Sequence, residues 1–246
     1  MAELDLGDLH INNDDKNIPS AVQKYHIGII PDGNRRWCTK NGVPVTALLE
    51  KLTNVATHSW AECKDLFPHL SLINAVSVYM LSKDNLFKRN DQTLDMIRQG
   101  LQMLVDGLEN PNFRALMSEV KIQFVGELHL LPTDIRALCT TLSDFCTNDN
   151  FVITGAIGYD PLLDSLRLLQ QSSSDAAEPP QTERPPQRDI DLVVRSGGEL
   201  RSSGFFPLKT LYSEWFYLDT LWPDMTFEAV DECVAAFLTR NRRFGK

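Results

Sequence analysis

The sequence lacks several features that would assign it to a familiar class of protein. It has no apolar run of about 18 residues, the length that a membrane-spanning helix needs. Its 33 acidic residues outnumber its 24 basic ones, and this balance argues against nucleic acid as a partner. It has no Walker A, GxGxxG, HExxH or CxxC motif, so the common nucleotide, zinc-protease and paired-thiol sites are excluded.

Cysteine is scarce as well. The five cysteines are odd in number and scattered, at Cys38, Cys63, Cys139, Cys146 and Cys233. No two of them have the spacing of metal ligands, which predicts free, buried thiols in a reducing compartment. We therefore expect a cytoplasmic protein.

Two segments stand apart in composition. Residues 1–22 are polar and lack the apolar stretch of a secretory signal, so we expect a mobile leader. Residues 170–188 are rich in Ser, Pro and Gln and have no apolar face, which predicts a disordered insertion. Residues 23–246 then form a single catalytic domain, long enough to bury a sizeable core.

Within that domain, apolar runs alternate with amphipathic stretches. Buried strands are predicted at Tyr25–Pro31, Leu72–Leu81, Val120–Val125, Phe151–Ile157, Asp191–Val194 and Tyr212–Leu218. Helices are predicted at Ala47–Leu66, Asp91–Glu109, Thr133–Thr147, Pro161–Gln171 and Phe227–Arg240. This alternation predicts an α/β fold, with a mostly parallel central sheet flanked by helices. Ligands of such sheets bind at the carboxyl ends of the strands.

The first strand runs into a loop that carries one carboxylate and two guanidinium groups. Asp32 is followed by Gly33, Asn34, Arg35 and Arg36. The glycine permits unusual backbone angles, and free amides of a helix beginning near Asn34 would help to hold an anion. The arginines offer bidentate contacts to phosphate, and the carboxylate offers the hard oxygen that Mg²⁺ prefers. The alternative is a surface turn with solvated arginines.

A second loop of the same kind follows the fifth strand. Arg195, Arg201 and Ser203 surround the Gly197-Gly198 bend, which predicts a second phosphate site, with a solvated glycine hairpin as the alternative. Because both loops follow strands, both are expected to face one cleft. Together they favour chemistry on a diphosphate.

Glu214 stands in an aromatic stretch, Tyr212-Ser213-Glu214-Trp215. If it is buried, this carboxylate needs a partner. A metal ion shared with Asp32 would supply one, and a structural salt bridge is the alternative.

These motifs, in this order, resemble those of the cis-prenyltransferase family, which includes the undecaprenyl diphosphate synthases. The family's His, apolar stretch and Asp-Gly-Asn-x-Arg-Trp correspond to His26 through Trp37. Its Arg-Thr-x-Gly-Glu-x-Arg-x-Ser corresponds to Arg195 through Ser203. Looser or shorter matches are Ser-x-Glu-Asn at Ser82–Asn85, Tyr-x-Glu at Tyr212–Glu214, Leu-Trp-Pro at Leu221–Pro223 and Arg-x-Gly at Arg243–Gly245.

The resemblance implies a homodimer with a hydrophobic tunnel for isoprenoid chains. It implies that Asp32, Asn34, Arg36 and Asn85 are catalytic and that Asp32 and Glu214 hold Mg²⁺. The residues that it assigns to the isoprenoid diphosphate substrates are Gly33, Arg35, Trp37, Ser82, Arg195, Arg201, Ser203, Arg243 and Gly245. Because isoprenoid products are hydrophobic, the resemblance is also compatible with peripheral contact between the protein and a membrane. Candidates for the tunnel wall are Leu101, Met103, Leu104 and Phe113, although an apolar helical stripe is more often plain core.

The chain departs from the family's pattern at several positions. Val45, Leu48 and Leu49 stand where the family has an Arg and then Gly-His, so two cationic contacts to the allylic diphosphate are missing. The family's Asn-Tyr-Gly-Gly becomes Gly158–Pro161. The segment Ser203–Lys209 is similar to small family members that make irregular or cyclised monoterpene diphosphates.

Three functions therefore remain open. The first is Mg²⁺-dependent condensation of short isoprenoid diphosphates, by regular cis-elongation or by irregular coupling or cyclisation. The second is a terpene synthase that ionises and cyclises a single allylic diphosphate, such as farnesyl or geranyl diphosphate. The third is a non-catalytic subunit of a heteromeric prenyltransferase, and the retained Asp32, Arg195 and Arg201 argue against it.

Overall fold

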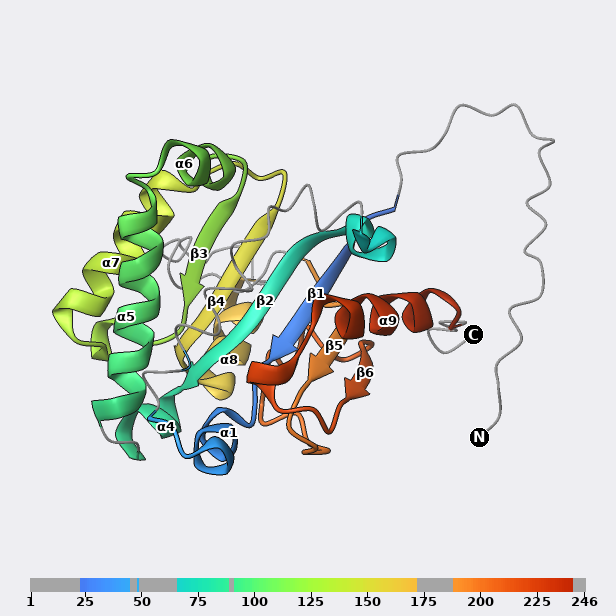
Figure 1. The fold of residues 1–246 in the computed structure, drawn as a ribbon. Coiled ribbons are helices and arrows are strands. Elements are labelled where there is room, and N and C mark those ends of the chain that lie inside the picture. Colours follow the sequence, from blue (N-terminus) through green and yellow to red (C-terminus); the bar gives the residue numbers. More distant parts are fainter. Residues whose placement is uncertain (1–22, 45–47, 49–65, 89–90, 172–187, 241–246) are drawn as a thin grey trace.

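Helices cover both faces of one central sheet (Figure 1). The computed structural model describes residues 23–44, 48, 66–88, 91–171 and 188–240. The strands are β1 (Tyr25–Ile30), β2 (Ile73–Ser82), β3 (Lys121–Val125), β4 (Val152–Tyr159), β5 (Leu192–Arg195) and β6 (Glu214–Tyr217). The α-helices are α1 (Asn34–Asn41), α4 (Lys83–Lys88), α5 (Asp91–Gly107), α6 (Pro111–Met117), α7 (Thr133–Phe145), α8 (Pro161–Gln171) and α9 (Phe227–Leu238).

The strands lie in the order β3-β4-β2-β1-β5-β6, and each pairs in parallel with its neighbours. This confirms the predicted α/β fold with a parallel sheet. The six predicted strands are all present, with ends that shift by no more than two residues. The leader at 1–22 and nearly all of the segment at 170–188 lie outside the described residues, as does most of the helix predicted over Ala47–Leu66.

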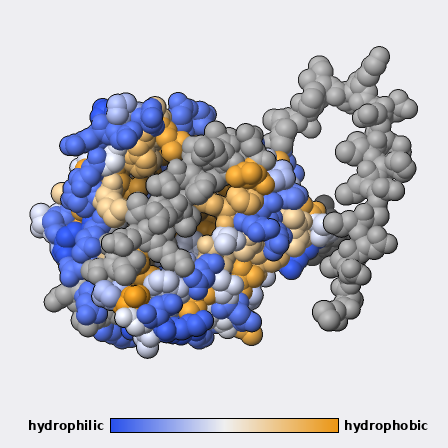
Figure 2. All heavy atoms as spheres, viewed as in Figure 1, coloured by the Kyte–Doolittle hydropathy of each residue, from blue (hydrophilic) through white to orange (hydrophobic). Residues whose placement is uncertain are grey.

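Alternate residues of each strand face opposite sides of the sheet, and this alternation divides the core. On one side, β2, β3 and β4 pack against α5, α6 and α7, where Ile135 and Leu142 are fully buried. On the same side, Val234 and Phe237 of α9 cover β1 and β5. On the other side, a third cluster includes Val193. Figure 2 shows mostly hydrophilic residues at the upper and left outline of this face, with hydrophobic ones nearer its middle and toward its right side.

Two short helices were not predicted from the sequence. Helix α6 begins at Pro111, and the Asn110 side chain accepts hydrogen bonds from the next two free backbone N–H groups. Helix α4 follows β2 without a break, and Ser82 Oγ accepts from the Asn85 N–H (3.2 Å). Both helices are too short to show an amphipathic period, so only their capping residues signal them.

All six strands end at one edge of the sheet, called here the carboxyl edge; their starts form the amino edge. Asp32 follows β1, Ser82 ends β2 and Arg195 ends β5, so all three lie at the carboxyl edge. None of the described helices is both long and apolar enough to span a bilayer.

Candidate active site

Two segments that are distant in sequence from Asp32 hold its main chain. Its N–H donates to Ser196 Oγ (2.9 Å), and the same hydroxyl donates to its carbonyl oxygen (2.9 Å). The N–H of Trp222, which follows β6, also donates to that carbonyl (2.9 Å). These bonds fix the loop after β1 against the loops after β5 and β6.

The Asp32 carboxylate lies between two guanidinium groups. Its Oδ2 is 2.8 Å from Nη2 of Arg195, and its Oδ1 is 3.5 Å from Nη2 of Arg36. The Gly33 N–H also donates to Oδ1 (2.6 Å). Burial by itself would raise the pKa of Asp32, but the Arg195 hydrogen bond, the Gly33 N–H and the Arg36 charge outweigh it and lower this pKa. The group is therefore an ionised, acceptor-only carboxylate at neutral pH.

Arg195 ends β5, and its side chain is only 3% exposed. Besides Asp32, its guanidinium donates to Ser203 Oγ (2.8 Å) and to the Arg201 carbonyl. Its Nε has no hydrogen-bond partner among the residues that the structure describes. Because buried guanidinium N–H groups are normally satisfied, this site has capacity for one further acceptor, such as an anionic ligand.

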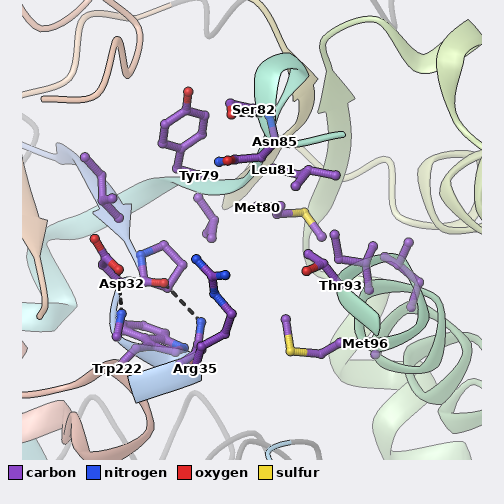
Figure 3. Close-up of a pocket in the computed structure, with 18 of the residues that line it drawn as sticks. Asp32, Arg35, Tyr79, Met80, Leu81, Ser82, Asn85, Thr93, Met96 and Trp222 are labelled. Carbon is purple, nitrogen blue, oxygen red and sulfur yellow. Dashed lines mark hydrogen bonds between the residues drawn. The ribbon is translucent and has the colours of Figure 1, made fainter. Parts of the chain in front are cut away.

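Helix α1 begins two residues after Asp32 and presents its first turn to the site. Gly33 precedes the helix with a φ of +96°, in the left-handed region that favours glycine. Asn34 Nδ2 donates to the Pro31 carbonyl (3.1 Å), while its buried Oδ1 has no partner in the described structure. Arg35 reaches into the middle of the neighbouring cavity (Figure 3). A helix therefore does begin at Asn34, which is the condition on which its free amides could help to hold an anion.

These groups open onto a cavity of about 1290 Å³ between the sheet and α5. Its mouth is charged and lies at the carboxyl edge. Figure 3 shows Thr93 and Met96 of α5 across the cavity from Asp32 and Arg35. The deeper wall is mainly apolar, and all four predicted tunnel residues lie on it: Leu101, Met103, Leu104 and Phe113. The cavity can therefore hold an anionic group at its mouth with a long apolar group behind it.

The chain's likeness to known proteins agrees with this arrangement. A family model described as "Putative undecaprenyl diphosphate synthase" matches residues 30–245. The chain belongs to this family. The resemblance to cis-prenyltransferases is thus confirmed, and the chain is a member of a family of prenyl-transferring enzymes.

Individual relatives cover almost the whole chain. An isoprenyl transferase of Streptococcus pneumoniae is 32% identical over 252 residues, which cover 93% of this chain and 94% of the relative. A tritrans,polycis-undecaprenyl-diphosphate synthase (geranylgeranyl-diphosphate specific) of Aeropyrum pernix is 30% identical, with coverage of 91% and 99%.

Solved structures of the family share the fold. Lavandulyl diphosphate synthase from Lavandula x intermedia, in complex with dimethylallyl diphosphate, aligns with a TM-score of 0.70 at 20% identity, over 92% of this chain and all of that one. A probable undecaprenyl diphosphate synthase from Campylobacter jejuni aligns with a TM-score of 0.63 at 22% identity, over 91% and 99%. Both support the α/β architecture of this family member.

The structure brings most of the predicted site residues together. The cavity is lined by Asp32, Gly33, Asn34, Arg35, Arg36, Ser82, Asn85, Arg195, Arg201 and Ser203. Trp37 is not on its wall, since its Nε1 instead donates to Asp224 Oδ1 (2.8 Å) and thereby holds α1 to the loop after β6. Arg243 and Gly245 lie outside the described residues.

Glu214 does not join Asp32 in the described chain. It begins β6 at the amino edge, where it pairs with Leu192 in the register of β5, whereas Asp32 follows the far end of β1. Its carboxylate makes an ion pair with Arg240. No cluster of three or more metal-ligating side chains occurs within the described residues. Within one chain, Glu214 therefore forms the structural salt bridge that the sequence analysis gave as the alternative to a metal ion.

Tyr79, Glu199 and Trp222 are among the cavity-lining residues that sequence reasoning missed. Tyr79 lies within β2, before Met80 and Leu81, and its hydroxyl donates to the Ser203 carbonyl (3.2 Å). Glu199 is 3.9 Å from the Arg36 guanidinium and also pairs with Arg201. Glu199 and Trp222 stand inside motifs already singled out, so their position in those motifs was the available signal.

Proposed function

We propose that the protein is a Mg²⁺-dependent prenyltransferase that condenses two short isoprenoid diphosphates. The observation that carries this proposal is the single cavity that combines a guanidinium-rich mouth with a deep apolar wall. A diphosphate is matched by several arginines near one carboxylate, and a hydrocarbon tail is matched by the wall of α5 and β2.

The two arginine groups divide the mouth between two diphosphates. In this proposal Arg35 and Arg36, with the amides at the start of α1, hold the allylic diphosphate. Arg195, Arg201 and Ser203 hold the diphosphate of the second substrate. The open Arg195 Nε supports this role, because a phosphate oxygen would satisfy it. Val45 and Leu49, which stand where the family has cationic side chains, lie outside the described residues. Leu48, the third position that departs from the family's pattern, is fully buried.

Asp32 is the residue suited to hold Mg²⁺. Its carboxylate lines the cavity, is ionised and has a side chain 34% exposed, and Mg²⁺ commonly takes one or two carboxylates together with substrate phosphates and water. When bound, the ion would neutralise charge on a departing diphosphate. Glu214 of the same chain cannot share that ion, because it lies at the other edge of the sheet. A ligand role for Glu214 would require a second copy of the chain.

The chain's own residues then account for the reaction. The guanidinium groups stabilise the allylic diphosphate as its C–O bond breaks, and the apolar wall keeps water away from the allylic cation. The double bond of the second substrate forms the new C–C bond, and the proton that is lost passes to the released diphosphate. The amides of Asn34 and Asn85 orient the diphosphates by hydrogen bonds.

We also propose a homodimer. Three large side chains on one face of α8 are exposed: Leu162 (75%), Leu166 (53%) and Leu169 (64%). Their spacing of four and then three residues places them in one stripe. Such an exposed apolar stripe is better explained by contact with a helix of a second copy than by exposure to solvent. Sedimentation of the full chain at several concentrations would test whether it forms a dimer.

The test of function is a product assay with purified protein and Mg²⁺. Dimethylallyl, geranyl and farnesyl diphosphate are each supplied with and without isopentenyl diphosphate, and extracts are analysed by gas chromatography–mass spectrometry before and after phosphatase treatment. A longer prenyl alcohol that appears only after phosphatase supports the proposal. A volatile terpene from one substrate without phosphatase would replace transfer by terpene synthesis. If no product forms under any of these conditions, the result would favour a non-catalytic subunit that needs a partner.

A further inference from the structure

A charged pair joins the ends of β2 and β4 beside the cavity. Ser82 pairs with Tyr159 in the sheet register, so the next residues, Lys83 and Asp160, leave the sheet side by side. Lys83 Nζ is 3.0 Å from Asp160 Oδ2, and the two side chains are only 32% and 20% exposed. This partial burial distinguishes the pair from the solvated surface pairs that contribute little.

The carboxylate of this pair is itself fixed. Its other oxygen, Oδ1, accepts the N–H groups of Leu162 (3.0 Å) and Leu163 (3.2 Å) and so caps the first turn of α8. Lys83 is the first residue of α4. The ion pair therefore ties the start of α4 to a rigid helix end.

The same corner also supports the loop after β5. A Cβ added to Gly204, whose φ is +74°, would lie 2.9 Å from Cγ of Pro161, so the loop rests against this proline. The preceding Ser203 has a φ of +51°, which is strained for a residue with a side chain. Contacts on both sides hold it there: the Tyr79 hydroxyl to its carbonyl and Arg195 to its hydroxyl.

We propose that Lys83, Asp160 and Pro161 form a positioning corner that sets the separation of Asn85 from Ser203 across the mouth of the cavity. The inference rests on the proposed function, in which Asn85 and Ser203 face the same pair of diphosphates. Lys83 acts through the first turn of α4, where the Asn85 N–H donates to Ser82 Oγ. Pro161 acts through its contact with Gly204. None of the three touches the substrates, so they control the rate by geometry.

The kinetic test uses Lys83→Met, Asp160→Asn and the double variant. Lys83→Met keeps the length of the side chain, and Asp160→Asn keeps an oxygen to cap α8. Because a displacement of about 1 Å at a reacting centre costs up to ~100-fold in rate, each change should lower kcat by about tenfold with a smaller change in KM. The double variant should lose no more than either single one, and Lys83→Arg should restore most of kcat.

A matched control is Lys121→Met, which removes another lysine–aspartate pair (Lys121 Nζ to Asp149 Oδ1, 2.8 Å) at the amino edge. It should leave kcat unchanged even where its melting temperature falls as far as that of Lys83→Met, so a loss of stability alone does not account for a loss of kcat. Parent-like kcat in Lys83→Met, or a loss that follows the melting temperature, would overturn the proposal.

Hydrogen–deuterium exchange tests the corner without substrate. In Lys83→Met, uptake should rise both in residues 83–88 and in residues 199–206, whereas in Lys121→Met neither segment should change. A rise confined to residues 83–88, or no rise, would show that the corner does not couple the two sides. If the parent forms no prenyl product at all, the proposed function fails, and the exchange comparison still decides whether the corner exists.

Discussion

The two edges of the central sheet use charged residues in different ways. At the amino edge, Arg188 donates to Asn74 Oδ1 (2.9 Å) and to the Lys24 carbonyl (2.8 Å), while Asp191 Oδ2 accepts the His26 N–H (2.9 Å). These bonds join the chain ends that enter the strands. At the carboxyl edge, guanidinium groups and a carboxylate instead line a cavity.

The difference concerns which unpartnered polar atoms belong to residues that line a cavity, because His26 Nδ1 near the amino edge also lacks a partner in the described structure but His26 is not on the cavity wall. Arg195 Nε and Asn34 Oδ1 are buried at the carboxyl edge without a partner in the described structure. An unsatisfied buried donor is costly, and a ligand that supplies the missing partner recovers that cost. Similar residue types therefore stabilise the fold at the amino edge and have hydrogen-bonding capacity for a ligand at the carboxyl edge. The following changes test this contrast, in order of decreasing effect.

The largest effect is expected from Asp32→Asn. This change keeps the size of the side chain and removes the charge that Arg195 and the proposed metal ion share. We expect kcat/KM to fall by about 1000-fold, the scale of losing a main electrostatic contact. The measurement is product formation at saturating Mg²⁺.

Asp191→Asn is the matched control at the amino edge. It should lower the melting temperature while leaving turnover nearly intact, since Asp191 contacts only the fold. Equal losses of turnover in the two variants would erase the distinction between the edges, and full activity in Asp32→Asn would refute the metal assignment.

A change at the far end of the cavity should alter the product rather than the rate. The Phe113 ring packs directly against Gly107 of α5: a Cβ added to this glycine would lie 2.9 Å from the ring. Phe113→Ala removes this wall and should shift the products toward longer chains by at least one five-carbon unit, measured by mass spectrometry. Phe145→Ala, in the same core but off the cavity wall, should leave chain length unchanged. An identical product distribution in both variants would contradict the role of Phe113.

Acid should reveal the Asp32–Arg195 ion pair. The pKa of Asp32 is lowered in the folded state from its usual 3.8, so the stability that it contributes is present above this value and is lost as the pH falls through the folded pKa. The parent should exceed Asp32→Asn by about 2 kcal/mol in unfolding free energy at neutral pH, and the gap should close below about pH 4. Denaturant titrations across this range would measure it; a gap that widens in acid has the wrong sign.

The smallest effect is expected at the amino edge. His69 Nδ1 is 2.8 Å from Asp231 Oδ2, and the other Asp231 oxygen accepts the Leu70 N–H (2.8 Å). His69→Gln should lower the unfolding free energy by about 1 kcal/mol, as for one hydrogen bond, with kcat unaltered. A change in kcat would extend the site to this edge.

The sequence was sufficient to predict the strands because buried runs such as Tyr25–Ile30 and Val152–Tyr159 are long and uninterrupted. It also placed Asp32, Arg195 and Ser203 in one site, since loops after parallel strands meet at one edge. Helices α4 and α6 escaped prediction because six or seven residues do not establish a helical period.

Glu214 is a predicted site residue that the structure does not bring to Asp32 within one chain. In a parallel sheet, a residue that begins one strand and a residue that follows another lie at opposite edges. The predicted strand over Tyr212–Leu218 already placed Glu214 near its start, so the topology argued against pairing it with Asp32 in one chain. The partner that it actually has, Arg240, sits 26 positions away on the turn after α9, a contact that depends on packing and has no local signature.

The Asp32–Arg195 contact has a consequence for how the protein is made. The two residues are 163 positions apart, and β1 cannot complete its pairing with β5 until both have left the ribosome. Contacts of such long range also form slowly, because the entropy of closing a large loop is lost before the contacts contribute any stabilising energy. The mouth of the cavity therefore takes shape late, and no ligand can bind between Asp32 and Arg195 before β5 has been made.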